Sequence, residues 1–427
     1  MADYGELLKH IKIPEFVKVR YHKEQAAVGD IPSAVQTAFE RLRPRKSIGK
    51  GMRIAVTAGS RQMSDYSVIL RGILDELKKL GAEPFLVPAM GSHGGADPQG
   101  QINVLKEYGV TEQSMGVPIC SSMETVSLGI AENGMEVRMD RFAYEADGIV
   151  LFNRIKSHTG FRGPIESGLM KMIAIGLGKQ HGANICHGAG PENMSSNIQS
   201  IAHYALKHSK ILFGIGVIEN GYHQTYKIEG IWADEIFEKE KLLLQEAKEL
   251  MLSIPFRKAD VLILDEIGKN IAGEGMDPNI TGRSYFIGNK EPFFESVAVL
   301  DITKESEGNG TGIGNADVIS KRAFDKFRME MTYPNCITSR DSKSTKIPVV
   351  MPNDKQALQY ALQICYGIDK ERGPKVVWLK NTLNLESFYI SEALIPEAEK
   401  IVGMEITGNC AEISFDDEGN ITEHFAD

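Results

Sequence analysis

The sequence predicts an α/β protein with two domains, each built mainly on a parallel sheet, and a candidate active site in the cleft between them. Short apolar runs rich in β-branched residues alternate with amphipathic helical segments, as in strand–helix–strand units. The chain has 427 residues, too many for one ordinary core. Basic or titratable side chains follow three of the predicted strands, at the edge where such sheets bind ligands.

Composition excludes several classes of partner and location. The net charge of −9 argues against a nucleic-acid partner, because surfaces that track phosphates carry a basic excess. No apolar run is long enough to span a membrane, and the N-terminus lacks the apolar core of a secretory signal. The five cysteines form no C-x-x-C pair, which favours a reducing cytoplasm over a zinc ribbon or an iron–sulfur cluster. The oligomeric state stays open, a homo-oligomer included.

The first domain begins with a strand–helix–strand unit. The run RIAVTAG (Arg53–Gly59) is typical of a buried strand, and EPFLVPA (Glu83–Ala89) is typical of the next. Between them, apolar side chains recur at helical spacing over residues 66–80, with Ser64 as the predicted N-cap and Gly81 at the helix end. This order predicts two parallel strands joined by a helix.

Further strands, a long helix and a boundary complete the first domain. GIVLFN (Gly148–Asn153) and ILFGIGVIE (Ile211–Glu219) predict two more strands, and a charged helix is expected over residues 233–251. The proline within Ile254–Phe256 stops helical continuation. We therefore expect the first domain to span residues 1–254.

A second α/β series predicts a second domain over residues 255–398. Its expected strands are VLILDEI (Val261–Ile267), SVAVLDI (Ser296–Ile302), IPVVMP (Ile347–Pro352) and KVVWLKN (Lys375–Asn381). Residues 399–427 are interpreted as a hairpin with its turn at Asp417–Asn420. We expect this terminal segment to return to the first domain.

The segment Lys156–Gly190 contains the densest group of candidate functional residues. Glycines recur along it, and they allow a backbone to approach a ligand closely. Lys171 lies within an apolar run, where a lysine must reach solvent, pair with an acid or be chemically modified. It is therefore a candidate nucleophile or covalent tether. Lys179 is predicted to be solvated, and His181 to be structural.

Three strand-end loops carry Arg61, His93 and His158. The guanidinium of Arg61 suits a substrate carboxylate, although a structural ion pair is an equal alternative. His93 lies between glycines, where a histidine that simply faces water is the alternative. Two histidines from two loops can take and return a proton across a substrate. The convergence of three loops favours a functional role.

Two further groups are candidate ligands. His187 cannot build a conventional metal site alone, since such a site needs three or four protein ligands. It could instead complete a metal site whose other ligands come from a bound cofactor. In the second domain, Lys269 and Arg283 follow the first predicted strand. We expect them to bind a carboxylate in the cleft between the domains.

This arrangement resembles the nickel-dependent lactate racemase family over roughly Arg53 to Arg283. The resemblance lies in the order of an arginine after the first strand, a histidine in the next glycine-rich turn, a second histidine, a lysine after a glycine, and a third histidine. The corresponding residues are Arg61, His93, His158, Lys171 and His187. The chain looks closer to relatives that act on other 2-hydroxyacids than to lactate racemase itself.

The resemblance implies a racemase or epimerase of a 2-hydroxyacid with a nickel-pincer nucleotide as its cofactor. Lys171 would carry this thiolated pyridinium mononucleotide covalently, and His187 would complete the square plane around nickel. Hydride would move from the substrate to the cofactor and back, while His93 and His158 move the hydroxyl proton and Arg61 holds the carboxylate. The cofactor implies maturation enzymes as partners. Protein from an ordinary host is expected to lack it.

Departures from the family pattern concern the substrate. Ala58 stands where family members often carry an aspartate, and the tyrosine, glutamine and lysine of the lactate pocket are not reproduced. Asn279 and Arg283 lie near that place and, with Lys269, are the expected substrate-binding residues of the second domain. Additional cationic groups favour a malate-like acid or a sugar acid over lactate as the small-molecule partner.

Two other functions remain open from the sequence. Lys171 could form a Schiff base with pyridoxal phosphate or with a carbonyl substrate, and borohydride trapping would detect that imine. The chain could also be a non-catalytic sensor of an anionic metabolite. In a sensor, loss of His93 would leave binding intact, whereas in a racemase it would abolish turnover.

Overall fold

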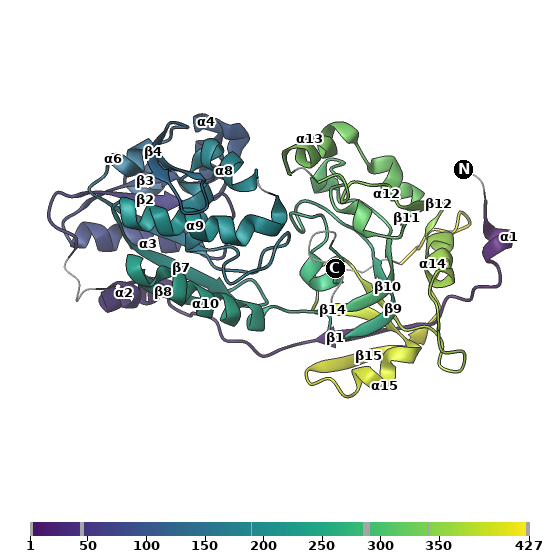
Figure 1. The fold of residues 1–427 in the computed structure, drawn as a ribbon. Helices are drawn as coiled ribbons and strands as arrows, with labels where there is room; N and C mark the ends of the chain where they lie inside the picture. Colours follow the sequence, from purple (N-terminus) through teal and green to yellow (C-terminus); the bar gives the residue numbers. More distant parts are fainter. Residues whose placement is uncertain (1–2, 43–46, 189, 285–290, 340, 424–427) are drawn as a thin grey trace. The chain divides into compact units, whose positions relative to one another are not determined.

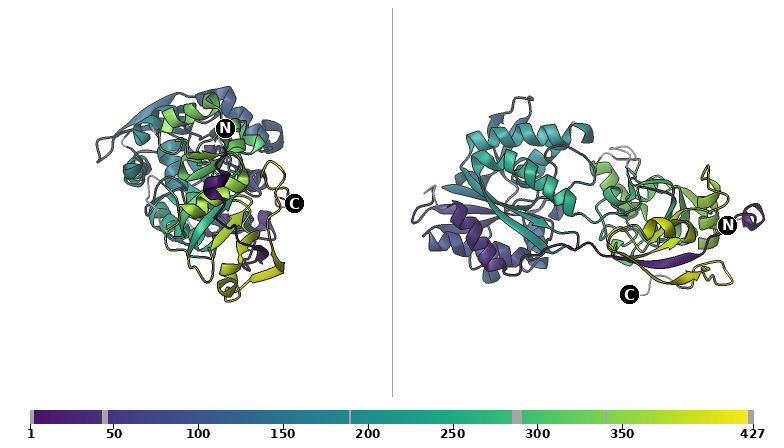
Figure 2. Two further views of the ribbon diagram at one scale, coloured as in Figure 1. Left: turned by 90° about the vertical axis from the view of Figure 1, so that its right-hand side faces the viewer. Right: turned by 90° about the horizontal axis from the view of Figure 1, so that it is seen from below.

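The computed structural model describes residues 3–42, 47–188, 190–284, 291–339 and 341–423. It divides the chain into two compact units, drawn in Figures 1 and 2. One unit is continuous and spans Gln25–Met251. The other combines Met1–Glu24 with Leu252–Asp427. Both units mix helices with mainly parallel strands, which confirms the predicted α/β class.

The continuous unit is built on a five-stranded sheet with the order β3-β2-β6-β7-β8. The first four strands in this order are parallel to their neighbours, and β8 is antiparallel to β7. The strands are β2 (Arg53–Ala58), β3 (Glu83–Pro88), β6 (Gly148–Arg154), β7 (Ile211–Glu219) and β8 (Thr225–Trp232). A separate hairpin joins β4 (Thr125–Ile130) to β5 (Glu136–Asp140).

Two apolar cores cover the two faces of this sheet, because successive side chains of a strand point to opposite faces. Ile54 and Val56 pack into one core, whereas Ala55 between them packs into the other. Figure 1 shows helices on both faces. The first core includes residues of α2 (Ile31–Leu42), α3 (Tyr66–Lys79) and α4 (Pro98–Glu107), and the second includes residues of α6 (Arg141–Glu145), α8 (Lys179–His187), α9 (Met194–His208) and α10 (Ile236–Leu250).

The other unit is built on an eight-stranded sheet with the order β12-β11-β10-β9-β13-β14-β1-β15. The strands from β12 to β13 are parallel, and the remaining three are antiparallel to their neighbours. Their bounds are β1 (Phe16–Tyr21), β9 (Lys258–Leu264), β10 (Phe293–Val299), β11 (Val318–Ser320), β12 (Val349–Met351), β13 (Val376–Leu379), β14 (Ser387–Ser391) and β15 (Met404–Ala411). Helix α14 (Asp354–Gln363) packs on the parallel part.

The division of the chain corrects the expected domain limits. The first 24 residues belong with the C-terminal unit, not with the domain that follows them. The terminal segment 399–427 belongs there too, so its expected return to the first domain is wrong. The cause is a ladder of backbone hydrogen bonds, because β1 lies between β14 and β15, with Phe16 opposite Ser391 and Tyr21 opposite Met404.

Most expected elements are present, with differences in local detail. Helix α3 begins after Asp65, which has a left-handed φ of 54°, so Ser64 is not the N-cap. The strand expected at Ser296–Ile302 begins earlier, at Phe293. Phe415 pairs with Ile421 around the predicted terminal turn. Within the described part of the chain, no helix combines the length and the apolar character that a membrane crossing requires.

Candidate active site

The candidate site lies at the carboxyl ends of the parallel strands of the continuous unit. Strand β2 has β3 on one side and β6 on the other, so the chain changes direction across the sheet between β2 and β6. Open α/β sheets bind ligands beside such a switch point. Arg61 follows β2, His93 follows β3, and His158 follows β6. The fold therefore brings the three predicted strand-end loops to one edge.

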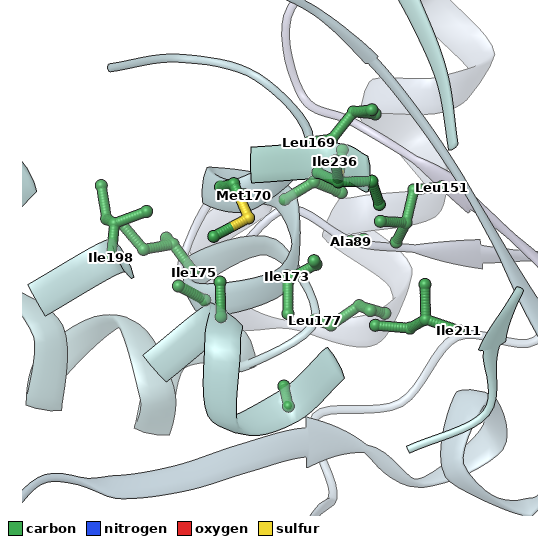
Figure 3. Close-up of a cluster of buried hydrophobic side chains, with 14 of the residues drawn as sticks. Ala89, Leu151, Leu169, Met170, Ile173, Ile175, Leu177, Ile198, Ile211 and Ile236 are labelled. Atoms are coloured by element: carbon green, nitrogen blue, oxygen red, sulfur yellow. The ribbon is translucent and has the colours of Figure 1, made fainter. Parts of the chain in front are cut away.

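Lys171 is the last residue of a short helix, α7 (Leu169–Lys171), and a π-helical turn (Met172–Gly176) follows it directly. Such turns are rare and are frequent at functional sites. Apolar side chains before and after the lysine anchor the turn in the core, as Figure 3 shows for Leu169, Met170 and Ile173. The side chain of Lys171 thus starts from a rigid, apolar support.

The amine of Lys171 is in an unusual electrostatic setting. Burial, helped by the positive charges of Arg61 and Lys156, lowers its pKa from 10.5 to about 8. The amine lies 5.7 Å from the centroid of the Phe161 ring. Among the residues that the structure describes, no carboxylate forms an ion pair with it. The chain therefore keeps an amine that loses its proton unusually easily.

This pKa predicts selective chemistry at Lys171 in the cofactor-free protein. At pH 8 about half of the Lys171 amines carry no proton, and the neutral amine is the nucleophile. We expect a limiting amount of an acetylating ester to modify Lys171 before Lys241, a surface lysine of α10. Peptide mass spectrometry between about pH 7 and pH 9 measures both rates. Equal rates at the two lysines across this range would contradict the assignment.

His158 is held by contacts on several sides. Its backbone N–H donates to Glu166 Oε2 at 2.7 Å, and its ring stacks on Phe161 with centroids 4.3 Å apart. The N–H of Gly160 donates to the ring Nδ1 at 2.9 Å. Burial, followed by the charges of Lys171 and Lys156, lowers the pKa of His158 well below 6.5. The ring is therefore neutral near pH 7, with its proton on Nε2.

The Gly160 contact makes a prediction about the His158 tautomer. Because Nδ1 accepts a hydrogen bond, we expect nitrogen NMR of the cofactor-free protein to show an unprotonated Nδ1 and a protonated Nε2. Because the pKa is lowered, both signals should keep their positions between about pH 8 and pH 6. The variant His158→Gln identifies the signals. Protonation of Nδ1 in this range would contradict the described geometry.

His93 and His187 both have lowered pKa values. For His93, burial lowers the pKa to about 4, helped by the charges of Arg61, Lys171 and His187. For His187, burial and the charge of Lys171 lower the pKa. His187 is the last residue of α8 and follows the buried Cys186. Both rings are neutral at pH 7, so both can accept a proton or bind a metal.

Electrostatic coupling shows which predicted residues lie near one another. The charge of Lys171 lowers the pKa values of His93, His158 and His187. The charge of Arg61 lowers those of His93 and Lys171. The five candidates of the continuous unit therefore lie near the Lys171 amine. Because positive charges at these residues would repel one another, the neutral forms of the imidazoles and of the amine are favoured.

Comparison with known proteins shows which proteins the part of the chain that carries this cluster resembles. Residues 4–198 match the family model of the lactate racemase N-terminal domain. Over these residues the chain is therefore similar to the N-terminal domain of lactate racemases. The structure is also similar to that of the lactate racemase apoprotein from Thermoanaerobacterium thermosaccharolyticum, with a TM-score of 0.54 and 15% sequence identity, over 87% of this chain and 99% of that one. That likeness shows a shared fold. No curated protein matches the sequence.

The three site residues expected in the second domain belong to the other unit, where local contacts occupy them. Arg283 forms an ion pair with Asp317 at 2.8 Å and donates to the carbonyls of Phe294 and Glu295. This network ties the guanidinium to a carboxylate and to the backbone, and the expected role of Arg283 in substrate binding stays a prediction. Lys269 donates to the carbonyl of Gly273 at 2.6 Å, and the Asn279 side chain donates to Asp277 at 2.8 Å.

Two buried carboxylates that the sequence analysis did not predict support the segment that carries His158 and Lys171. Glu166 accepts hydrogen bonds from Ser157 Oγ and the His158 N–H, and Lys248 lies 2.6 Å from it. Glu240 accepts from the Met170 N–H at 2.9 Å, at the start of α7. Burial raises the pKa of Glu240 to about 7. These groups fix the loops that carry His158 and Lys171.

The sequence contained a signal for one of these carboxylates. Glu240 lies on the same helical face as Ile236, Leu243, Leu244 and Ala247, all of which are buried. An acid on an apolar face indicates a buried partner. A Cβ at Gly168 would lie 2.4 Å from Glu240 Oε1, so the glycine before α7 permits this approach. No such pattern in the sequence indicated that Glu166 is buried, because its partners come from a separate loop and from α10.

Two other expectations within the Lys156–Gly190 segment have opposite outcomes. The prediction that Lys179 is solvated is wrong, since its side chain is 0% exposed. His181 lies at the surface, 4.0 Å from Glu136, in keeping with a structural role. The burial of Lys179 arises from a left-handed backbone, with φ of 54°, which turns the side chain inward at the start of α8.

Proposed function

We propose that this protein racemises or epimerises a 2-hydroxyacid by means of a nickel-pincer nucleotide tethered to Lys171. The observation that carries the proposal is the Lys171 amine, whose pKa is lowered to about 8 beside three neutral histidines. The similarity of residues 4–198 to the N-terminal domain of lactate racemases supports the reaction class. The proposed cellular location is the cytoplasm, and five free cysteines are consistent with it.

The residues present fit this cofactor. Lys171 offers a nucleophilic amine for the covalent link. In the described ranges, no group of three histidines, cysteines or acids could hold a metal by itself, so His187 would act as one ligand among others supplied by the nucleotide. Arg61 and Lys156 provide positive charge near Lys171 that suits a phosphate. Enzymes that assemble and load the cofactor are the expected partners.

When bound, the cofactor supplies a hydride acceptor beside the substrate carbon. Arg61 binds the carboxylate of the 2-hydroxyacid through its planar guanidinium. Its charge also keeps the neighbouring imidazole of His93 neutral. The apolar side chains around the Lys171 turn exclude water from one side of the site. These groups therefore orient the substrate and protect a reactive centre.

His93 and His158 form the pair that takes the 2-hydroxyl proton and returns it to the oxygen. At pH 7 the His93 ring is neutral and can accept this proton, because its pKa is lowered to about 4. The His158 ring has Nδ1 engaged by Gly160 and so offers the Nε2–H as a donor to the substrate oxygen. In this tautomer His93 takes the proton and becomes charged, while His158 donates a hydrogen bond to the substrate oxygen and keeps its own proton. The charged His93 returns the proton to the oxygen after the planar ketoacid has turned, which completes the inversion.

The substrate proposal is tested by racemisation assays with a panel of 2-hydroxyacids. The protein is produced together with its maturation enzymes, and chiral chromatography follows lactate, malate and a sugar acid. The preference for a malate-like or sugar acid rests on departures of the sequence from the family pattern, and Arg283, one of the residues concerned, forms an ion pair with Asp317. Preferred turnover of lactate would reject this preference. No inversion of any member would reject the proposed reaction.

One observation also favours a Schiff-base function as a second candidate. A lysine with a pKa near 8 is a suitable amine for condensation with a carbonyl group. Borohydride added in the presence of pyridoxal phosphate or a ketoacid would fix an imine at Lys171, and peptide mass spectrometry would detect it. A thioamide link to the nucleotide is not an imine and would not be fixed in this way.

A further inference from the structure

A buried polar cluster connects the His93 loop to the segment that carries Lys171. Lys179, Gln101 and Asp140 form it, and each side chain is 0% exposed. The Lys179 amine lies 3.0 Å from Gln101 Oε1 and 3.3 Å from Asp140 Oδ2, and it also donates to the carbonyl of Pro88, the last residue of β3. Three oxygens thus surround an ammonium that has three donors.

Gln101 carries the connection to His93. Its Nε2 donates to the carbonyl of Gly91 at 3.1 Å and to the carbonyl of His93 at 3.2 Å. The same loop is joined to the π-helical turn after Lys171, because the N–H of Gly91 donates to the carbonyl of Gly176 at 3.2 Å. The side-chain amide of Gln101 therefore fixes the backbone on both sides of Ser92, next to the proposed proton acceptor.

Forming this cluster costs free energy in two ways, which indicates that it does more than fill space in the core. A fully buried ion pair loses hydration that its attraction does not always repay. Lys179 also has a φ of 54°, a backbone conformation that non-glycine residues adopt only when the surroundings impose it. An apolar side chain at position 101 would leave the carbonyls of Gly91 and His93 without the donors they now have.

We infer that Gln101 and Lys179 are positioning residues that hold His93 in register with Lys171. Lys179 orients the amide of Gln101 by occupying its oxygen, so the two N–H groups face the loop carbonyls. This inference rests on the proposed function, in which His93 moves the hydroxyl proton. Neither positioning residue touches the reacting atoms. They affect turnover only by setting the position of the His93 ring.

The test compares Gln101→Leu with Gln359→Leu as a matched control. Gln359 is likewise buried, and its Nε2 donates to two backbone carbonyls, those of Leu8 and Ile11, at 3.1 Å and 3.0 Å, in the other unit. The two variants should lower Tm by similar amounts. In cofactor-free protein with carbon-labelled histidines, Gln101→Leu should shift or broaden the ring signal of His93. Gln359→Leu should leave that signal in place. His93→Gln identifies it.

A second pair of variants keeps the test decisive if leucine at 101 prevents folding. Gln101→Glu retains an oxygen for Lys179 but lacks the N–H donors, so it should disturb the His93 signal as well. Lys179→Met combined with Asp140→Asn removes both buried charges together, and it should disturb the signal without leaving an unpaired carboxylate. Arg41→Lys, at the surface ion pair with Glu229, serves as the folding control.

Turnover provides the second readout. In cofactor-loaded protein, Gln101→Leu should lower kcat by about 10²-fold, the order of effect of a small misplacement of a catalytic group, with little change in KM. An unmoved His93 signal in Gln101→Leu, or an equal shift in Gln359→Leu, would overturn the inference. The NMR result needs no cofactor. If the wild type is inactive but Gln101→Leu shifts the His93 signal, the proposed function is rejected and the positioning role is retained.

Discussion

Replacing Lys171 with arginine should abolish racemisation in protein produced together with its maturation enzymes. Arginine keeps the positive charge and much of the length of the side chain. However, its guanidinium stays protonated at any pH the protein survives, so it offers no nucleophilic amine. The wild-type amine has its pKa lowered to about 8 and is held between an apolar turn and the Phe161 ring. Without it the cofactor has no covalent anchor.

Nickel content and activity are measured together on the purified Lys171→Arg variant. Both should fall to background, while the circular dichroism spectrum and Tm stay close to wild type, because arginine keeps the contact with Phe161. Lys241→Arg, at a surface ion pair of α10, is the matched control and should retain nickel and turnover. A Lys171→Arg protein with wild-type activity would show that the lysine is not a tether.

Replacing His93 with glutamine should lower kcat by about 10²- to 10⁴-fold, the usual contribution of a general acid or base. The neutral ring of His93 accepts the hydroxyl proton at pH 7, and glutamine cannot. Substrate binding should persist, because Arg61 supplies the carboxylate contact. The modification at Lys171 and the nickel content should also persist, which separates this loss from that of the anchor.

His208→Gln provides the control for His93→Gln. His208 lies at the end of α9, where its ring stacks on Tyr204 with centroids 4.0 Å apart. This variant should keep full turnover. Steady-state kinetics and calorimetry with the preferred acid measure the two effects. Unchanged kcat in His93→Gln would remove His93 from the mechanism, and intact binding by a wild type without turnover would favour a sensor.

The strands of the continuous unit and the loops that follow them could be predicted from the sequence because the signals are local. Runs such as Arg53–Gly59 are apolar and β-branched, and the structure forms β2 there. Parallel strands place their carboxyl ends at one edge, so Arg61, His93 and His158 were expected to gather. The structure places them within electrostatic reach of Lys171.

What could not be predicted depends on contacts between distant parts of the chain. The pairing of β1 with β14 and β15 joins the two ends of the chain. The sequence of residues 16–21 does not indicate which strands they pair with. Lys179 resembles a surface lysine until the acceptors from Pro88, Gln101 and Asp140 are known. The ion pair of Arg283 with Asp317 joins residues far apart in the sequence, so it could not be predicted either.

Peptide mass spectrometry of cofactor-loaded protein tests the central proposal most directly. The protein is produced with its maturation enzymes, digested, and examined for the peptide that contains Lys171, with nickel measured on the intact protein. We predict that Lys171 carries the mass of the pincer nucleotide and that the intact protein binds nickel, which His187→Ala removes. An unmodified Lys171 in a nickel-free protein, produced under conditions that load a known lactate racemase, would contradict the proposal.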